Sequence, residues 1–296
     1  MKHAFLITTY GHFDLLYHLL VALNHCDSLF YIHIDKKSAR KAQSSKYIEE
    51  IKKFPNAVIL SNNIKVNWGA FSHSQAIILL LKEAMKNTET EYFHTMSAQD
   101  FPIHNISKIF SFFEEARRQN FEYISHKPVP TPTWKGDQGR DRFQYYHLND
   151  YLNPKSKIPW IMIRIGVHLQ KLLHLKRTFP EGFEQLYGGH IWWSLSRDVI
   201  TCLLRYIADN PCFINRFKHT FCSEEIIFQT IILNSPYAKN VVNNNLRYVE
   251  MQGASPKILK AEDYEKLIHS DRLFARKMAK ESAPLVKMLQ NESDIG

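Results

Sequence analysis

Two adjacent acidic residues, Glu224 and Glu225, open an otherwise apolar run that extends to Thr230. A carboxylate at the mouth of an apolar helix is placed to act as a general base, because the helix terminus can orient it toward a hydroxyl group. The same residues also fit an ordinary helix start, with Ser223 as the N-cap and both acids in the first turn. The local sequence leaves both interpretations open.

Several common catalytic motifs are absent. The chain contains no HExxH, no G-x-S-x-G, no GxGxxG and no GxxxxGK[ST], so a zinc-protease site, a hydrolase elbow, a dinucleotide fingerprint and a P-loop have no support. It also lacks a D-x-D tripeptide, which many sugar transferases use to hold a metal on a diphosphate. Fixed cations would then stabilise the diphosphate, and Arg247 and Lys277 are candidates, although each alone also fits a surface charge. We therefore predict a site without a metal.

The composition fits one large α/β domain or two small ones, since 45% of the 296 residues are hydrophobic. The net charge of +9 indicates a polyanionic partner, which could be nucleic acid, an acidic membrane face or a phosphate-bearing substrate. A basic nucleic-acid-binding protein is the alternative from a different class, although no RRM, KH or helix-turn-helix signature supports it. The four cysteines lack CxxC spacing, and no apolar run approaches the roughly 20 residues of a membrane span, so we expect an intracellular protein with free thiols.

Short apolar runs alternate with amphipathic stretches in the first half, in the order expected of βαβ units. The runs predicted as strands are residues 4–9, 28–35, 57–61, 92–97 and 121–126. The stretches with helical spacing are residues 13–23, 39–53, 71–86 and 106–118. This alternation predicts an α/β fold with a mostly parallel central sheet and helices on both faces.

The second half predicts a different series of elements. Residues 127–139 contain proline, threonine and glycine and predict a loop long enough to act as a lid or to bind an acceptor. A helix is expected over residues 158–175 and a strand over residues 190–196, with Gly188 and Gly189 permitting close backbone approach before that strand. From residue 261 onward we expect a helical, basic tail.

Polar residues follow three of the predicted strands. They are Thr8, Thr9 and Tyr10, then Asp35, Lys36 and Lys37, and finally Asp100 within the segment 99–102. Ligands of open α/β sheets bind at the carboxyl ends of the strands, so these residues are expected to border one ligand site.

Six segments occur in the order found in one known family. They are HIDKK at 33–37, WGAFS at 68–72, QDFPI at 99–103, the stretch 189–198, SEE at 223–225 and LFARK at 273–277. From about residue 4 to residue 277, the chain resembles the core-2/I-branching β-1,6-N-acetylglucosaminyltransferases and their peptide O-xylosyltransferase relatives, glycosyltransferase family 14. The resemblance implies a GT-A type fold and an inverting, metal-independent transfer from a UDP-sugar.

The resemblance also implies roles for single residues. Glu225 matches the catalytic base, which leaves Glu224 as the helix-capping partner. Arg247 and Lys277 match the cations that hold the diphosphate. Contacts to the nucleotide sugar fall on Thr8, Thr9, Tyr10, Asp35, Lys37 and Trp68, although the Thr-Tyr-Gly segment replaces an Ala-His-Lys type segment of many members.

On the acceptor side we expect Asp100, Arg142, Gly189 and Trp192. Core packing is the alternative for Trp192. The disulfide cysteines and membrane anchor of the animal enzymes are absent, and the region between Glu225 and Arg247 is shorter, which indicates a compact bacterial-type member in a reducing compartment.

We therefore expect a single GT-A domain over residues 1–296. Residues 1–126 would bind the nucleotide sugar, residues 127–260 would bind the acceptor and catalyse transfer, and residues 261–296 would form the basic tail. The expected reaction moves a sugar, first of all N-acetylglucosamine, from a UDP-sugar to a hydroxyl of a glycan or lipid-linked glycan in bacterial surface polysaccharide synthesis. UDP-xylose or another UDP-sugar is the alternative donor. We expect no cofactor, no metal, no nucleic-acid partner, and a cytoplasmic location with peripheral contact of the tail to the inner membrane face.

Overall fold

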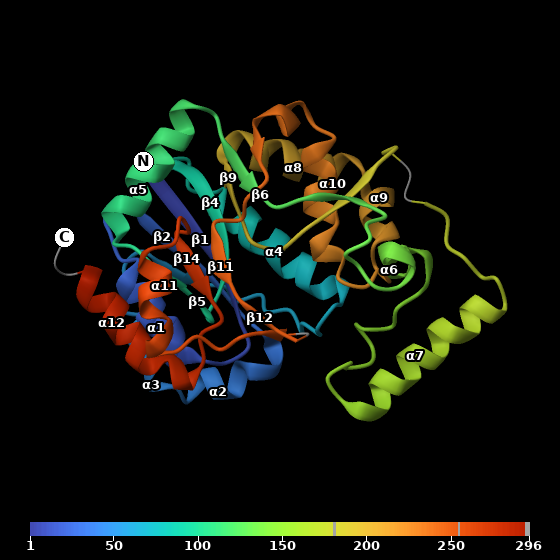
Figure 1. Ribbon diagram of the computed structural model, residues 1–296, viewed down its shortest axis with the longest axis horizontal. Helices are drawn as coiled ribbons and strands as arrows, with labels where there is room; N and C mark the ends of the chain where they lie inside the picture. Colours follow the sequence, from blue (N-terminus) through green and yellow to red (C-terminus); the bar gives the residue numbers. More distant parts are fainter. Residues whose placement is uncertain (180–181, 254, 294–296) are drawn as a thin grey trace.

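A seven-stranded sheet forms the centre of the molecule in the computed structural model, which describes residues 1–179, 182–253 and 255–293 (Figure 1). Its strand order is β10–β6–β9–β4–β1–β2–β3. Only β9 runs antiparallel to its neighbours among the described strands of this sheet, and the other pairings are parallel. The bounds are β1 Lys2–Thr9, β2 Ser28–Ile34, β3 Ala57–Ile59, β4 Thr90–Ser97, β6 Glu122–Ile124, β9 Trp193–Ser196 and β10 Val241–Val242. The prediction of a mostly parallel sheet is confirmed.

Helices cover both faces of this sheet, as predicted. Side chains alternate along β1, so that Phe5 and Ile7 enter one core while Ala4 and Leu6 enter the other. The first core is completed by α1 Phe13–Ala22, α2 Ala39–Gln43, α3 Lys46–Ile51, α5 Ile106–Arg118, α11 Tyr264–Ile268 and α12 Ala283–Ser293. The second core is completed by α4 Phe71–Ala84, α8 Arg197–Asp209, α9 Pro211–Arg216 and α10 Ile227–Leu233.

A second, three-stranded sheet joins the C-terminal segment to the main sheet. Its order is β11–β14–β5, with bounds β11 Arg247–Val249, β14 Phe274–Arg276 and β5 Asp100–Pro102. Strand β5 follows β4 closely and pairs antiparallel with β14. The pairing therefore brings residue 276 and its neighbours to the end of β4.

Short elements complete the fold. Two two-stranded ribbons are formed by β7 Lys127–Val129 with β8 Leu186–Gly188, and by β12 Met251–Gln252 with β13 Ser255–Pro256. The remaining helical turns are η1 Lys36–Ser38, η2 Asp137–Gly139, α6 Asp141–Gln144, η3 Ser223–Glu225, η4 Pro236–Asn240, η5 Ala261–Asp263 and η6 Lys280–Ser282.

Some predicted segments differ from the structure. The helix expected over residues 39–53 is two short helices, α2 and α3. The strand expected over residues 190–196 begins only at Trp193. The loop expected over residues 127–139 begins with β7, whose three residues are too few to show the alternation that marks a strand in sequence.

The expected basic, helical tail is built into the body instead. Residues 261–296 carry seven Asp and Glu against six Lys and Arg, so the segment is not basic, and it includes strand β14. Phe274, Leu285 and Leu289 are buried in the first core. These apolar side chains stabilise the fold and are not available to a membrane.

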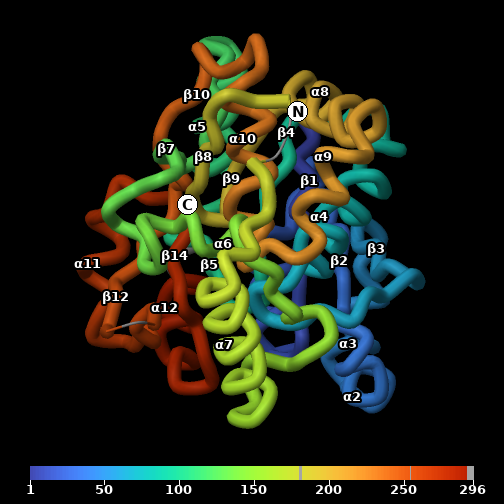
Figure 2. The backbone as a smooth tube through the Cα atoms, turned by 90° about the vertical axis from the view of Figure 1, so that its right-hand side faces the viewer, coloured from blue at the N-terminus to red at the C-terminus, as the bar shows by residue number. Residues whose placement is uncertain are grey.

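Helix α7, Lys157–Leu172, stands apart from the body in Figure 1, and in Figure 2 it is seen in front of the body. It has no buried residue along its length. Helical spacing predicted this element, but packing against the cores does not account for its apolar residues.

Candidate active site

The ends of the predicted strands meet at one edge of the main sheet. Thr9 of β1 lies opposite Ile34 of β2, and Thr8 lies opposite Ser97 of β4. Because β9 runs antiparallel to β4, Trp193 at its start reaches the same edge. Residues that follow β1, β2 and β4 are therefore gathered with residues that precede β9.

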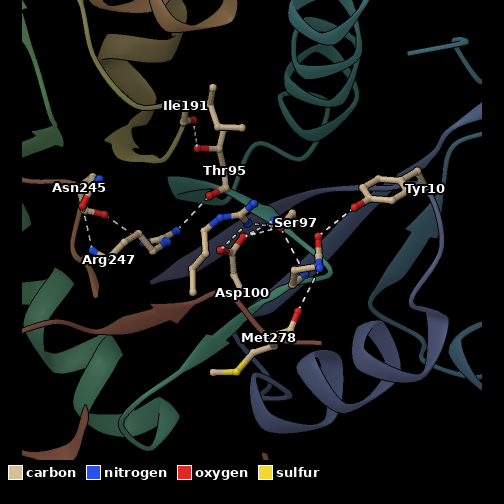
Figure 3. A network of polar contacts seen from close by, with 10 residues as sticks. Tyr10, Thr95, Ser97, Asp100, Ile191, Asn245, Arg247 and Met278 are labelled. Atoms are coloured by element: carbon tan, nitrogen blue, oxygen red, sulfur yellow. Dashed lines mark hydrogen bonds and ion pairs between the residues drawn. The ribbon is translucent and has the colours of Figure 1, made fainter. Parts of the chain in front are cut away.

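Tyr10 leans across this edge toward Gln99. Its hydroxyl donates to Gln99 Oε1 at 3.1 Å, while Gln99 Nε2 donates to the carbonyl oxygen of Met278 at 3.0 Å (Figure 3). The ammonium of Lys155, from the loop before α7, lies 4.7 Å from the centre of the Tyr10 ring. Tyr10 remains half exposed, so an aromatic face with a cation beside it is open to a ligand.

The other residues after β1 and β2 mainly shape the backbone. Thr9 is buried, and its carbonyl oxygen accepts from the Asp35 N–H at 2.8 Å. Asp35 is also buried, and its Oδ1 accepts from the Lys37 N–H at 2.9 Å. Thr8 is half-buried at the end of β1. Thr9 and Asp35 thus stabilise the backbone turns after β1 and β2, and any direct contact between them and a nucleotide remains a prediction.

Lys37 and Trp68 belong to a neighbouring loop wall. Lys37 Nζ donates to the Val66 carbonyl oxygen at 2.6 Å and to Asn67 Oδ1 at 3.1 Å. The Trp68 side chain, 55% exposed, meets the Phe221 ring edge to face at 5.2 Å between centroids. Lys37 therefore fixes the loop that presents an exposed indole beside the segment leading to the two adjacent acids.

Asp100 anchors a cation rather than facing solvent. It is 1% exposed, and its Oδ2 accepts from the Ser97 N–H at 2.6 Å (Figure 3). Its Oδ1 accepts from Arg276 Nη1 at 3.2 Å, and the Arg276 guanidinium lies 4.3 Å from the centre of the Trp192 ring. Asp100 was predicted to bind the acceptor, but because it is buried its effect on an acceptor would be indirect, through Arg276.

The two cations expected to hold a diphosphate differ in exposure. Arg247 is 4% exposed and donates to the Thr95 carbonyl oxygen at 3.0 Å, and burial lowers its pKa to about 10 (Figure 3). Lys277 is half-buried, and burial lowers its pKa, as do the positive charges of Arg276 and Lys155. Positive charges that lower the pKa of a neighbouring lysine in this way mark a place where an anion is favoured.

Glu225 lies in a tight turn opposite a second cation. The helical turn η3 follows Cys222, whose φ of 51° is left-handed. Glu225 Oε2 accepts from Arg142 Nη1 at 2.6 Å, and the Glu225 carbonyl oxygen accepts from the Gly189 N–H at 2.9 Å. The side chain is 27% exposed, and burial raises its pKa although Arg142 lowers it. The structure therefore joins three predicted residues, Glu225, Arg142 and Gly189.

Glu224 does not cap a helix, contrary to the prediction. Helix α10 begins at Ile227 without a side-chain cap, and Ser223 is not an N-cap but shares a hydrogen bond of 2.8 Å with Ser74 Oγ. Glu224 Oε1 lies 3.2 Å from His73 Nδ1, and its Oε2 is buried without a hydrogen-bond partner. The turn thus directs the two acids to different partners.

Gly189 and Trp192 lie between the two ends of the site. A Cβ at Gly189 would come within 1.9 Å of the Ser125 carbonyl oxygen, so only glycine permits this backbone approach. Trp192 is half-buried, with Arg276 over its ring and His190 at 5.9 Å between ring centroids. Neither full core packing nor an open stacking platform describes Trp192.

Several residues of this edge were not predicted. Two of them are Trp134 and Lys127. The Trp134 ring centre lies 3.6 Å from the guanidinium of Arg142, which was predicted, and 5.5 Å from Lys127 Nζ. Arg276 could have been suggested by its place beside Lys277 in the LFARK segment. Lys155 gave no signal, because a lone lysine in a loop is common on any surface.

One group of potential metal ligands occurs among the described residues. His25, Cys26 and Asp27 lie together just before β2. They are at the amino end of that strand, whereas the strand exits described above are at the carboxyl end. The expectation of a reaction without a metal remains a prediction.

Comparisons with known proteins point to one family. The model of the family described as Core-2/I-Branching enzyme matches residues 3–270. Xylosyltransferase 1 of Mus musculus is 24% identical over 299 residues, a match that covers 94% of this chain and 29% of the relative. Xylosyltransferase oxt of Drosophila melanogaster is 24% identical over 301 residues, covering 94% of this chain and 32% of the relative. The chain thus spans about a third of the length of the curated relatives it matches.

The comparison of structures gives a more distant likeness. Mouse Xyloside xylosyltransferase 1 in its apo form is 10% identical, with a TM-score of 0.40 and coverage of 95% of this chain and 98% of that one. Within the part of the chain that the structure describes, no helix has the length and apolar composition needed to cross a membrane.

Proposed function

Because the chain belongs to the Core-2/I-Branching enzyme family, we propose that it is an inverting glycosyltransferase that moves a sugar from a UDP-sugar to a hydroxyl of a glycan acceptor. The observation that carries the proposal is the Glu225 carboxylate, held by Arg142 on the same sheet edge as the cations Arg276 and Lys277. A base and a cationic site for a leaving group are the two functions that such a transfer requires.

Glu225 acts as the general base in this proposal. Arg142 holds Oε2, and no described residue forms a hydrogen bond with Oε1, which leaves that oxygen for the acceptor hydroxyl. Burial raises the pKa of Glu225, so its carboxylate is a stronger base than an exposed glutamate. A positioned base of this kind contributes roughly 100- to 10,000-fold to the rate.

The transfer then proceeds as one displacement. The acceptor oxygen forms a bond to the anomeric carbon and loses its proton to Glu225, while the bond from that carbon to the diphosphate oxygen breaks. UDP leaves with the bonding electrons, and attack from the opposite face inverts the anomeric centre. Lys277 keeps the role that the resemblance implies, and Arg276 and Lys155 take the place of the predicted Arg247, which is only 4% exposed. These three cations stabilise the negative charge that grows on the diphosphate, which is why we propose that no metal is needed.

Two donor sugars are candidates. N-acetylglucosamine is our first choice because the core-2/I-branching enzymes that the chain resembles transfer it. The matching curated relatives are named xylosyltransferases, so UDP-xylose is the second candidate. We further propose a glycan or lipid-linked glycan of a bacterial surface polysaccharide as the acceptor and the cytoplasm as the location.

A screen of UDP-sugars tests the proposal. UDP release should occur with one or a few donors, should depend on Glu225, and should persist in EDTA. UDP should also raise the melting temperature more than an oligonucleotide does. A shift with the oligonucleotide alone would favour the nucleic-acid-binding alternative, and a strict need for a divalent metal would contradict the part assigned to the fixed cations.

A further inference from the structure

Helix α7 turns its apolar side chains away from the protein. The side chains on this face are exposed by 39% to 71%, and they are Ile158, Ile161, Met162, Ile165, Leu169 and Leu172. At 3.6 residues per turn, the spacing of these positions places all six within an arc of roughly 100°. A soluble helix ordinarily points such a stripe toward the core, so this contiguous apolar surface requires a partner.

The opposite side of α7 is partly covered, and its last turn is hydrogen-bonded to the segment after α6. Ile163, Val167 and Gln170 are less exposed than the apolar stripe. Gln170 Oε1 accepts from the Tyr146 N–H at 2.7 Å, and Gln170 Nε2 donates to the Tyr146 carbonyl oxygen at 3.1 Å. These contacts fix the rotation of the helix about its axis, so the apolar stripe faces outward in a defined orientation.

The charged side chains of the segment that carries the stripe are all positive. Residues 151–179 contain six Lys and Arg and no Asp or Glu. Lys157 and Arg164 lie along one flank of the stripe by helical spacing, and Lys171 lies on the same flank but is paired with Asp141. Trp160 lies beyond this flank, on the side away from the stripe; it is 44% exposed, and the Arg164 guanidinium lies 4.7 Å from the centre of its ring. An exposed apolar stripe flanked by lysine and arginine is typical of helices that lie in the surface of an anionic bilayer.

We propose that α7 docks the protein on an anionic lipid surface, with its axis in the membrane plane and the apolar stripe inserted among the acyl chains. A second copy of the chain is a poorer occupant, because a symmetric contact would bring two segments of net positive charge together. The negative headgroups of a bilayer instead complement this charge. The proposal replaces the tail of residues 261–296 with α7 as the membrane-binding element.

The helix is tied to the candidate site at both ends. Before its first turn, the Lys155 ammonium lies above the Tyr10 ring. Near its last turn, Lys171 forms an ion pair with Asp141, which directly precedes Arg142 in α6. Docking through α7 would therefore hold the site beside the lipid surface. This step rests on the proposed function, and it points to an acceptor that is itself anchored in the membrane.

Sedimentation with vesicles tests the docking independently of catalysis. The protein should sediment with vesicles of phosphatidylcholine and phosphatidylglycerol, and much less with phosphatidylcholine alone. The double variant Ile165→Glu/Leu169→Glu should bind the anionic vesicles at least about 10-fold more weakly per replaced residue. The control Val21→Glu/Val58→Glu changes two similarly exposed apolar side chains on other elements and should bind like the wild type.

The outcomes separate the alternatives. The proposal is overturned if the wild type does not bind the anionic vesicles, or if the α7 variant binds them as well as the wild type does. A wild-type dimer that becomes monomeric in the α7 variant, seen by light scattering without vesicles, assigns the stripe to a second copy and also overturns it. Unchanged thermal stabilisation by UDP shows that the variant keeps its fold. If vesicle binding follows the expected pattern while no UDP-sugar is turned over, the proposed transfer fails and the docking stands.

Discussion

The substitution Glu225→Gln tests the assignment of the base directly. It removes the carboxylate charge but keeps an oxygen that can accept from Arg142, so the side chain should remain in place. We expect the rate of transfer to fall by roughly 100- to 10,000-fold, the contribution of a positioned general base. Binding of UDP should change little, because the proposed diphosphate contacts come from Arg276, Lys277 and Lys155.

The stability of this variant follows from the surroundings of Glu225. The pKa of Glu225 is raised in the folded protein, so the folded state holds this proton more tightly than the unfolded chain does. The resulting stabilisation is present below the unfolded pKa and is lost as the pH rises through the folded pKa. At neutral pH the ionised side chain therefore costs stability, which a neutral Gln relieves. Weakening the charge-assisted bond to Arg142 costs up to about 1.5–3 kcal/mol in the other direction. The melting temperature should consequently change by only a few degrees.

The pH dependence adds a second readout. The ionised form of Glu225 is the active one, so wild-type transfer should fall as the pH decreases through the pKa of this residue. Because burial raises that pKa above 4.5, the decline should begin at a higher pH than for an exposed glutamate. The acidic decline should be absent from the residual activity of Glu225→Gln.

Glu224→Gln is the matched control, since it changes the neighbouring carboxylate in the same turn. Its partner is His73, and it should retain most of the transfer activity. Transfer, UDP binding and melting temperature should be measured for both variants, with the donor found in the screen. Full activity of Glu225→Gln would refute the assignment of the base. The same holds if Glu225→Gln stays active while Glu224→Gln is inactive.

Three further changes have defined expectations. Arg142→Gln removes a positive charge that lowers the pKa of Glu225, so the acidic decline in the pH–rate profile should move to higher pH; an unmoved profile would show that Arg142 does not act on the base. Lys277→Met should reduce the rate of transfer by roughly 100- to 1,000-fold through lost stabilisation of the leaving diphosphate, and a rate near that of the wild type would remove Lys277 from this role. Gly189→Ala should lower the free energy of unfolding by about 1–3 kcal/mol in denaturant titrations, because its Cβ meets a backbone oxygen at 1.9 Å. The control Gly166→Ala has open space around it in α7 and should not lower the free energy of unfolding.

The position of the site could be predicted from the sequence. The alternation of apolar runs and amphipathic stretches predicted a parallel sheet, and the rule that ligands bind at strand ends selected Tyr10 and the segment around Asp100. Both predictions depend on local periodicity, which the sequence displays directly. The ordered segments that resemble the family then identified Glu225 and Lys277 as the residues to examine.

The roles within the site depended on contacts between distant segments. The local sequence allowed either of two adjacent acids to cap a helix, but the left-handed turn at Cys222 sends Glu224 to His73 and Glu225 to Arg142. The pairing of β5 with β14 carries Arg276 to Asp100. No local pattern encodes such a pairing, because a three-residue strand shows too little alternation to reveal its partner.

The sequence by itself therefore determined the class of fold, the family and the edge of the sheet where chemistry is expected. Tertiary structure decided which charges face one another there, and it also decided that the apolar face of α7 points outward. The physical reason is that periodicity shows only that a helix has an apolar face, while the direction of that face is set by the contacts on its other side. In α7 these contacts include the hydrogen bonds of Gln170 to Tyr146. The charge and pKa of Glu225 likewise depend on burial and on Arg142, which is 83 residues away in the chain.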